Sequence, residues 1–404
     1  MQGETILCVA TEDWHSLWRP IQQTMSRFVP KNRVIYFNPG RNPERTAMSE
    51  MLDNLPHYWK LRPEVVCENL IVIPTPSSLP HARQFLPRSV LQITMPMVIK
   101  INARILIRHV RRTMEALRIR SPILWLYDPR QIDLIGKFGE KLTCYHNYDE
   151  FSNFTQNSRI RELVRNLDDE LCRRVDVVFA TSRSQWEHRK AFNPNTYCIP
   201  NGVDFDLFNK ALNSETPIPS DIASLKKPII GYVGWLGYQM DLDLLLRISE
   251  AYPDCSLALV GPDVMPNNAK HRRLQAMSNV HFMGQKALGS LPEYLRAIDV
   301  ALIPYLLEGY VLTAYPLKLH EYLAAGRAIV STALPELRPY SHVVRIAETH
   351  VEFISQIRES LHDHNPQSIA ARVAVARENT WDNRIADMHS VLQPLLSGSE
   401  KPEL

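Results

Sequence analysis

The sequence predicts an α/β protein built from two Rossmann-like domains. The chain has 404 residues, enough for two domains that each bury a core. It opens with an apolar strand over 5–10, a polar loop, an amphipathic helix to about residue 28 and a second strand over 32–37. Five or six further strand–helix units follow within 226–347. This alternation favours parallel sheets, which bind ligands at the carboxyl ends of their strands.

Composition points to a globular cytoplasmic protein. Hydrophobic residues make up 45% of the chain and charged residues 22%. No apolar run approaches eighteen residues, and the first residues lack a basic region, so we expect neither a signal peptide nor a membrane span. The six cysteines are scattered singly and are expected to be reduced core thiols; they are Cys8, Cys67, Cys144, Cys172, Cys198 and Cys255.

The first domain contains a polar cluster after a predicted strand. Apolar runs at 69–74 and 122–127 predict buried strands with a long helix between them, and the next strand, 141–145, runs into a His-Asn-Tyr-Asp-Glu sequence. His146 and Asp149 could orient an acceptor hydroxyl or stabilise a developing oxocarbenium ion. The polar residues could equally cap the following segment, and the residues alone do not separate the two interpretations.

The remaining elements of this domain lead to a junction. A helix is expected at 158–174, a strand at 175–181 and a helix at 184–191, before the Asn201-Gly202 turn signal. The loop at 11–15 has no G-x-G-x-x-G pattern, which gives no support for NAD binding. We predict a first domain over 1–205, a second over 206–380 and a terminal helix over 381–404. The first half is net basic and the second net acidic, which indicates different partners.

The second domain is organised around residues 304–332. Pro316 suits the first turn of a helix and Gly326 suits its end, so a helix is predicted over 316–325, followed by a strand over 328–332. Its apolar residues, three and four apart, should be buried, which leaves Lys318 and Glu321 together on another face.

Lys318 and Glu321 have two possible roles. The helix start and Lys318 could hold a diphosphate, and Glu321 could accept two hydrogen bonds from a ribose diol. The alternative is an ordinary surface ion pair at i,i+3, which the two residues alone favour.

The wider stretch changes that balance. The pattern P-x-K-x-x-E-Y-L-A-x-G before a short apolar strand resembles the donor segment of retaining glycosyltransferases of the GT-B type, specifically glycosyltransferase family 4. The resemblance implies two Rossmann-like domains facing across a cleft and a C-terminal helix, from Trp381, that crosses back to the first domain. It also implies that Glu321 binds the ribose, that Pro316, Leu317 and Lys318 hold the diphosphate, and that His146 lies near the transferred sugar.

Three positions depart from the family pattern. Thr313 replaces a second Glu that commonly contacts the sugar ring, and Trp235 and Met240 stand where many relatives carry an Arg and a Lys. Lys318 would then neutralise more of the diphosphate. We assign Thr313, Gly234, Trp235 and Gly261 to the candidate donor site beside the helix residues.

Metal ions are not expected. Two D-x-D patterns, at Asp204 and Asp241, could suggest Mn²⁺ or Mg²⁺ binding, but one falls in the predicted interdomain turn and the other at a helix start, where acidic residues are common. We predict no cofactor and no metal requirement, with a nucleotide sugar as co-substrate.

The predicted function is sugar transfer from a nucleotide-sugar donor, UDP-linked by family resemblance, to an acceptor hydroxyl in cell-surface polysaccharide or glycolipid synthesis. Two alternatives stay open: a GT-B epimerase acting on a nucleotide sugar, and a catalytically inactive nucleotide-sugar-binding subunit. The partners would be the donor and a glycan or lipid-linked acceptor, not nucleic acid. The sequence does not identify the sugar, the base, the acceptor, the linkage or the oligomeric state.

A basic stretch over 83–120 suggests a membrane surface. It holds nine Lys and Arg residues and one acidic residue, and Lys100, Arg104, Arg108 and Arg111 recur at helical spacing. A solvated charged face is an equally good interpretation of this pattern. Family members that extend lipid-linked glycans often dock on anionic membranes in this way, so we expect peripheral attachment to the inner face of the plasma membrane.

Overall fold

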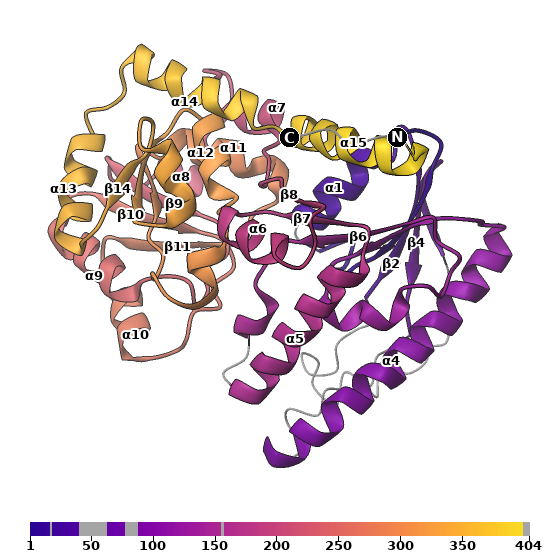
Figure 1. Cartoon of the computed structure of the whole chain (residues 1–404). Coiled ribbons are helices and arrows are strands. Elements are labelled where there is room, and N and C mark those ends of the chain that lie inside the picture. The colour runs from indigo at the N-terminus through magenta and orange to yellow at the C-terminus, as the bar shows by residue number, and fades with distance from the viewer. Residues whose placement is uncertain (17, 40–62, 77–87, 155–156, 399–404) are drawn as a thin grey trace. The chain divides into compact units, whose positions relative to one another are not determined.

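A computed structural model describes residues 1–16, 18–39, 63–76, 88–154 and 157–398 (Figure 1). The chain forms two compact units. The first contains Met1–Pro200 and Ile385–Leu404, and the second contains Asn201–Arg384. The predicted boundaries, after residues 205 and 380, lie a few residues from these.

The first unit is built on an eight-stranded sheet in the order β3-β4-β2-β1-β5-β6-β7-β8. All neighbouring strands are parallel except β3 and β4. The strands are β1 (Thr5–Val9), β2 (Arg33–Asn38), β3 (Glu64–Cys67), β4 (Leu70–Pro74), β5 (Ile123–Leu126), β6 (Leu142–Asn147), β7 (Val177–Ala180) and β8 (Thr196–Cys198). The chain winds outward from β1 in both directions, so ligands are expected at the carboxyl ends of β1 and its neighbours.

Helices of the first unit connect these strands. Pro20 begins α1 at the position where its missing N–H costs nothing, and Asn157 and Ser182 cap α5 and α6 with side-chain oxygens. The helices are α1 (Pro20–Phe28), α4 (Arg88–Leu117), α5 (Ser158–Arg174) and α6 (Arg183–Lys190), with 3₁₀ turns η2 (Pro129–Leu134) and η3 (Phe151–Phe154).

The second unit is built on a fully parallel six-stranded sheet in the order β11-β10-β9-β12-β13-β14. Its strands are β9 (Ile229–Val233), β10 (Ser256–Val260), β11 (Val280–Gly284), β12 (Val300–Ile303), β13 (Ala328–Thr332) and β14 (Arg345–Ala347). This is the strand order of a doubly wound nucleotide-binding sheet, and its direction of winding reverses between β9 and β12. The predicted fold class is confirmed in both units.

Short helices surround the second sheet. They are α7 (Phe205–Asn209), α8 (Ser220–Ala223), α9 (Leu242–Ala251), α10 (Ala269–Gln275), α11 (Leu291–Ala297), α12 (Lys318–Ala324), α13 (His350–Ser360) and α14 (Pro366–Glu378), with 3₁₀ turns η4 (Lys210–Leu212), η5 (Leu288–Ser290), η6 (Gly309–Thr313) and η7 (Pro335–Tyr340). The strand predicted at 328–332 is correct to the residue. The helix predicted at 316–325 begins two residues later, because Pro316 and Leu317 belong to the approach to α12.

The last helix, α15 (Trp381–Ser397), joins the core of the first unit. Met388, Val391 and Leu392 are buried in the same cluster as Phe28 and Trp125. The predicted return of the C-terminal helix to the first domain is therefore confirmed.

The structure bears on the basic stretch of α4 and on the expectation that the chain has no membrane span. The basic residues Lys100, Arg104, Arg108 and Arg111 are all exposed along α4, which Figure 1 shows as one long helix. Among the described residues, none of the helices combines the length and the hydropathy needed to cross a bilayer.

The cysteines are unpaired, but they are not all core thiols as predicted. Cys67 and Cys198 are exposed, whereas the other four are buried. Cys67 lies on β3, whose four residues are all exposed, and Cys198 ends the short strand β8. Both belong to strands at the ends of the sheet order, which explains why burial fails there.

Candidate active site

The candidate donor site is assembled on α12 in the second unit. Leu319, Tyr322 and Leu323 are each 0% exposed, as predicted, and fix the helix against the sheet. The Tyr322 hydroxyl accepts a hydrogen bond from the Val233 amide (2.8 Å) and donates one to the Val233 carbonyl (3.2 Å). This pair of bonds ties α12 to the carboxyl end of β9.

Gly234 lies next to the Lys318 side chain. It has a φ of 153°, and a Cβ placed on it would lie 2.5 Å from Lys318 Cε. Gly261, with a φ of 144°, approaches Gly234 so closely that its Cβ would lie 1.7 Å from the Gly234 carbonyl oxygen. A side chain at Gly261 would collide with the backbone of Gly234, and one at Gly234 would displace the Lys318 side chain. The φ of both glycines is also unfavourable for other residues.

Lys318 and Glu321 form an ion pair with an Nζ–Oε2 distance of 2.6 Å. Their side chains are only 15% and 13% exposed. The pairing expected of an ordinary surface pair is present, but its burial is not typical of one. A partly buried pair loses some of its hydration, and the ion-pair contact has to offset that cost.

The glycine turn after β9 is held by polar contacts. The Trp235 carbonyl accepts hydrogen bonds from the Tyr232 hydroxyl (3.1 Å) and the Gln239 amide (2.6 Å). The Trp235 side chain is 38% exposed. Met240 is 2% exposed, so its side chain belongs to the core of the second unit.

Thr313, Pro316 and Leu317 approach α12 from η6. The Thr313 hydroxyl donates to the Tyr310 carbonyl (2.9 Å) at the end of η6, and Leu317 is the first boundary residue of α12. Pro316 and Leu317 therefore lie immediately before Lys318, the first residue of α12.

Asp204 and Asp241 act as helix caps. Their side chains accept hydrogen bonds from the backbone amides of Leu207 and Leu244, at the starts of α7 and α9. Asp241 also contacts His350 through Nε2 at 2.8 Å. These contacts account for the first acid of each D-x-D pattern.

In the first unit, β6 places His146 in an aromatic cage. His146 is 1% exposed and its ring lies 5.3 Å from that of Tyr127 and 6.1 Å from that of Trp125. Burial lowers the pKa of His146 to about 3, so the imidazole is neutral at physiological pH. Its Nδ1 is buried and has no hydrogen-bond partner among the described residues.

Asp149 follows His146 in the loop after β6. Burial raises the pKa of Asp149 to about 7, with Arg19 opposing the shift and Glu12 and Glu150 adding to it. Arg19 and Glu12 belong to the segment after β1 and pair at 3.1 Å. The loops after β1 and β6 thus bring a carboxyl group that titrates near neutrality to the carboxyl edge of the first sheet.

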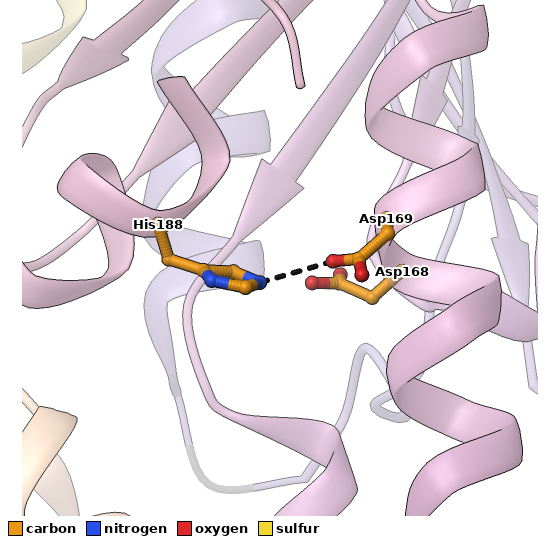
Figure 2. A group of neighbouring side chains, drawn as sticks. All are labelled: Asp168, Asp169 and His188. Carbon is orange, nitrogen blue, oxygen red and sulfur yellow. Dashed lines mark hydrogen bonds and ion pairs between the residues drawn. The ribbon is translucent and has the colours of Figure 1, made fainter. Parts of the chain in front are cut away.

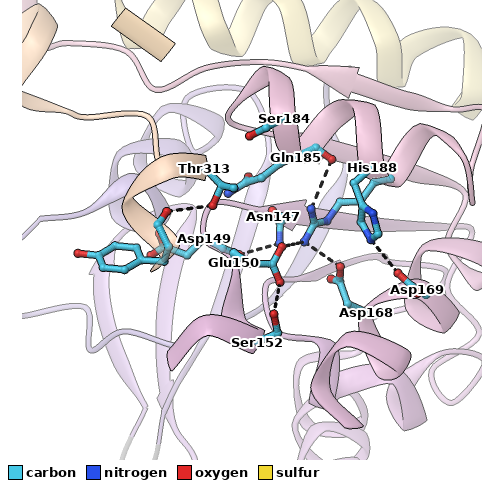
Figure 3. A network of polar contacts seen from close by, with 12 residues as sticks. Asn147, Asp149, Glu150, Ser152, Asp168, Asp169, Ser184, Gln185, His188 and Thr313 are labelled. Carbon is cyan, nitrogen blue, oxygen red and sulfur yellow. Dashed lines mark hydrogen bonds and ion pairs between the residues drawn. The ribbon is translucent and has the colours of Figure 1, made fainter. Parts of the chain in front are cut away.

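A buried ion-pair network that the sequence did not predict holds this loop (Figure 3). Arg189, 1% exposed, contacts Asp168 at 2.7 Å and Glu150 at 3.3 Å. Asn147 donates to the Tyr145 hydroxyl and to the Asp149 carbonyl, both at 2.9 Å. The residues near Asp149 on both sides, Asn147 and Glu150, are therefore held in place by hydrogen bonds and an ion pair. Arg189 looks like an ordinary basic residue in the last turn of a helix, so no local pattern reveals the network.

Asp168, Asp169 and His188 have the chemistry of metal ligands (Figure 2). Their ligand atoms lie within 4.8 Å of one another. Asp168, however, already accepts from the Tyr145 hydroxyl at 2.5 Å and pairs with Arg189. Because a buried guanidinium supplies the compensating positive charge, this group fits a structural ion-pair cluster better than a cation site.

Part of the second unit matches a known protein family. Residues 227–363 match the model of the family described as Glycosyl transferases group 1. A curated relative, the putative teichuronic acid biosynthesis glycosyltransferase TuaH of Bacillus subtilis, is 24% identical over 233 residues. That similarity covers 55% of this chain and 58% of the relative, so it spans a little over half of each protein.

Solved structures resemble the whole chain in fold. Sucrose-phosphate synthase from Thermosynechococcus elongatus has a TM-score of 0.67 and 16% identity, covering 99% of this chain and 100% of that chain. Anabaena Alr3699/HepE in complex with UDP has a TM-score of 0.62 and 15% identity, covering 96% and 99%. These similarities show that the chain has the GT-B fold.

Proposed function

We propose that this chain is a glycosyltransferase that transfers a sugar from a UDP-linked donor to an acceptor hydroxyl with retention of anomeric configuration. The observation that carries the proposal is the partly buried Lys318–Glu321 pair beside Gly234, where β9 ends in a doubly wound sheet. The match of residues 227–363 to Glycosyl transferases group 1 covers this segment. UDP is the ligand of the HepE structure, which has the same fold.

Lys318 would stabilise the departing diphosphate. Its ammonium exchanges Glu321 for phosphate oxygens, where it opposes the charge that develops as the bond to the sugar breaks. Glu321, released from Lys318, accepts hydrogen bonds from the ribose diol. The exchange replaces one charge-assisted contact with others, so the buried groups are not left unpaired.

A metal ion is not part of this proposal. Lys318 would supply the positive charge that a divalent cation supplies in other transferases. The capping roles of Asp204 and Asp241 are consistent with this, because both carboxylates are engaged at helix starts.

The carboxyl edge of the first sheet would hold the acceptor and the transferred sugar. His146 is neutral and offers a hydrogen bond from an aromatic, largely dry environment. Asp149 can be either protonated or ionised near pH 7, as a group that exchanges a proton with an acceptor hydroxyl requires. The name of the curated relative suggests a cell-surface polysaccharide as the product class.

The exposed basic residues of α4 would attract the chain to an anionic membrane. Ile99, Ala103 and Val110 of the same helix are buried in the first unit, so these apolar residues are not free to insert into a bilayer. We therefore propose electrostatic attachment at the surface, with a lipid-linked or membrane-proximal acceptor.

The proposal is tested by thermal unfolding with a panel of nucleotide sugars, followed by product analysis. A true donor should raise the unfolding temperature, because it binds the folded state alone. Incubation with acceptor membranes should then yield a transferred sugar with retained configuration. Binding without turnover would instead identify an inactive donor-binding subunit, which the Trp235 and Thr313 replacements make worth testing. An isomerised nucleotide sugar formed without acceptor would identify an epimerase.

A further inference from the structure

A hollow of about 610 Å³ lies on the second unit, away from the candidate donor site. Its lining includes Ile329, Arg345, Gln356, Ser360, Ser368 and Arg372. Ile329 is the second residue of β13 and Arg345 is the first residue of β14, so the hollow lies near the amino ends of these strands. Gly234 and Gly261, by contrast, follow the carboxyl ends of β9 and β10. In a parallel sheet the amino ends of the strands all lie on one side and the carboxyl ends on the other, so the hollow and these glycines lie at opposite ends of the strands.

Three buried polar atoms of the lining residues lack a partner within the described parts of the chain. They are Arg345 Nε, Gln356 Oε1 and Ser360 Oγ. Ser360 is 0% exposed. Gln356 and Ser360 are four residues apart on α13 and therefore lie on the same face of that helix. Leaving such atoms unpaired is costly, which points to a ligand that supplies both an acceptor for Arg345 and a donor for Gln356.

The charges around the hollow favour an anion. Arg345 and Arg372 both line it, and Asp363 is the acidic side chain of the lining. Arg372 is 3% exposed and is held by Asp363 and by the Gly326 carbonyl at 3.4 Å. Arg345 pairs with the exposed Glu359 at 2.7 Å. The first turn of the 13-residue helix α14 contributes Gln367 and Ser368, so its positive end adds to this potential.

We infer that this hollow is a second binding site, for a small polyhydroxylated anion of the sugar-phosphate class. The anionic group contacts Arg345 and the start of α14, and hydroxyl groups pair with Gln356 Oε1 and Ser360 Oγ. The volume lies in the range of small-molecule sites. The site stands apart from the proposed transfer reaction and does not depend on it.

The test is calorimetric titration of the full chain with glucose 6-phosphate, glucose and inorganic phosphate. A Lys318→Ala variant is used throughout, because it weakens anion binding at the candidate donor site. We expect glucose 6-phosphate to bind more tightly than either glucose or phosphate. Arg345→Gln and Ser360→Ala should each weaken it by ~10-fold, in line with the loss of one or two hydrogen bonds.

Two further variants separate local from general charge effects. Glu359→Gln should tighten binding severalfold, because it frees Arg345 from its present partner. Arg247→Gln, an exposed change on α9, should leave affinity unchanged. No binding of glucose 6-phosphate at millimolar concentration would overturn the inference and leave ordered water as the occupant. Binding that is indifferent to both Arg345→Gln and Ser360→Ala would overturn it as well.

Discussion

Lys318 and Gly234, 84 positions apart in the chain, are in such close contact that a Cβ on Gly234 would lie 2.5 Å from Lys318 Cε. A side chain at the end of β9 would therefore compete for space with the Lys318 side chain. Tyr322 fixes the same helix to the residue before Gly234. In the candidate donor site, Gly234 therefore leaves room for the Lys318 side chain, and Tyr322 holds α12 against the end of β9.

Gly234→Ala should weaken nucleotide-sugar binding at least ~10-fold. The added methyl group displaces Lys318, and the φ of 153° is unfavourable for alanine. Calorimetry with UDP measures the effect. Gly289→Ala is the matched control, since a Cβ on Gly289 meets nothing within 4 Å. Equal affinities in the two variants would contradict the role assigned to this contact.

Glu321→Gln should keep the fold but lower kcat/KM by about tenfold to over a hundredfold. The amide preserves shape while removing charge-assisted hydrogen bonding to the ribose, worth about 1.5–3 kcal/mol. Glu250→Gln breaks an exposed pair with Arg273 and serves as control, because such pairs contribute little. Unchanged kinetics in a well-folded Glu321 variant would remove this residue from the site.

Lys318→Ala should abolish most activity while transfer by the unaltered protein survives EDTA. In the proposed mechanism Lys318 supplies the positive charge at the diphosphate, so we expect that activity needs no metal that EDTA could remove. Initial rates with and without chelator, followed by Mg²⁺ or Mn²⁺ addition, measure this. Complete inhibition by EDTA that a metal restores would show that a cation does this work.

The donor segment could be predicted because its signals are local. The apolar run at 328–332 specifies a buried parallel strand, and residues three and four apart specify which side of α12 is buried. The same spacing predicts that Lys318 and Glu321 pair. It does not predict that the two side chains are only partly exposed, which depends on contacts with distant segments.

The network behind Asp149 could not be predicted, because each contact joins distant segments. Arg189, Asp168 and Glu150 come from α6, α5 and the loop after β6. Each of them is an ordinary charged residue in its own segment. Only the stacking of these elements buries Arg189 and makes its two acidic partners necessary.

Asp149→Asn should make stability less dependent on pH. The pKa of Asp149 rises from 3.8 to about 7 on folding, so the native state holds a proton between those values that the unfolded state loses. The protonated Asp149 side chain therefore makes its full contribution to the free energy of unfolding below pH 3.8, and this contribution is lost as the pH rises through 7. At pH 8 the variant should be more stable than the unaltered protein by ~1–3 kcal/mol, because it never buries the charge.

Urea unfolding at several pH values measures this difference. His146, whose pKa falls to about 3, destabilises both proteins as pH falls below 6.5, so subtracting the curves isolates Asp149. Asp206→Asn, at an exposed position, should give no such difference. If the free energy of unfolding of Asp149→Asn varied with pH in parallel with that of the unaltered protein, the pKa of Asp149 would not be raised in the folded state.

Reversing Arg104, Arg108 and Arg111 to Glu should release the protein from anionic liposomes. These side chains are exposed along α4, whereas Ile99, Ala103 and Val110 of the same helix are buried, so we expect the attraction to be mainly electrostatic. Each basic residue near an anionic surface contributes roughly 1 kcal/mol, and the attraction weakens as salt shortens the screening length. Co-sedimentation should therefore fall both in the triple variant and on raising salt.

Reversal of Arg165, Arg174 and Arg247, three exposed arginines elsewhere, makes the same change in net charge and should have a much smaller effect. If the two triple variants lose binding equally, overall charge rather than the α4 stripe is responsible; a protein that ignores such liposomes at low salt would favour an acceptor free in solution.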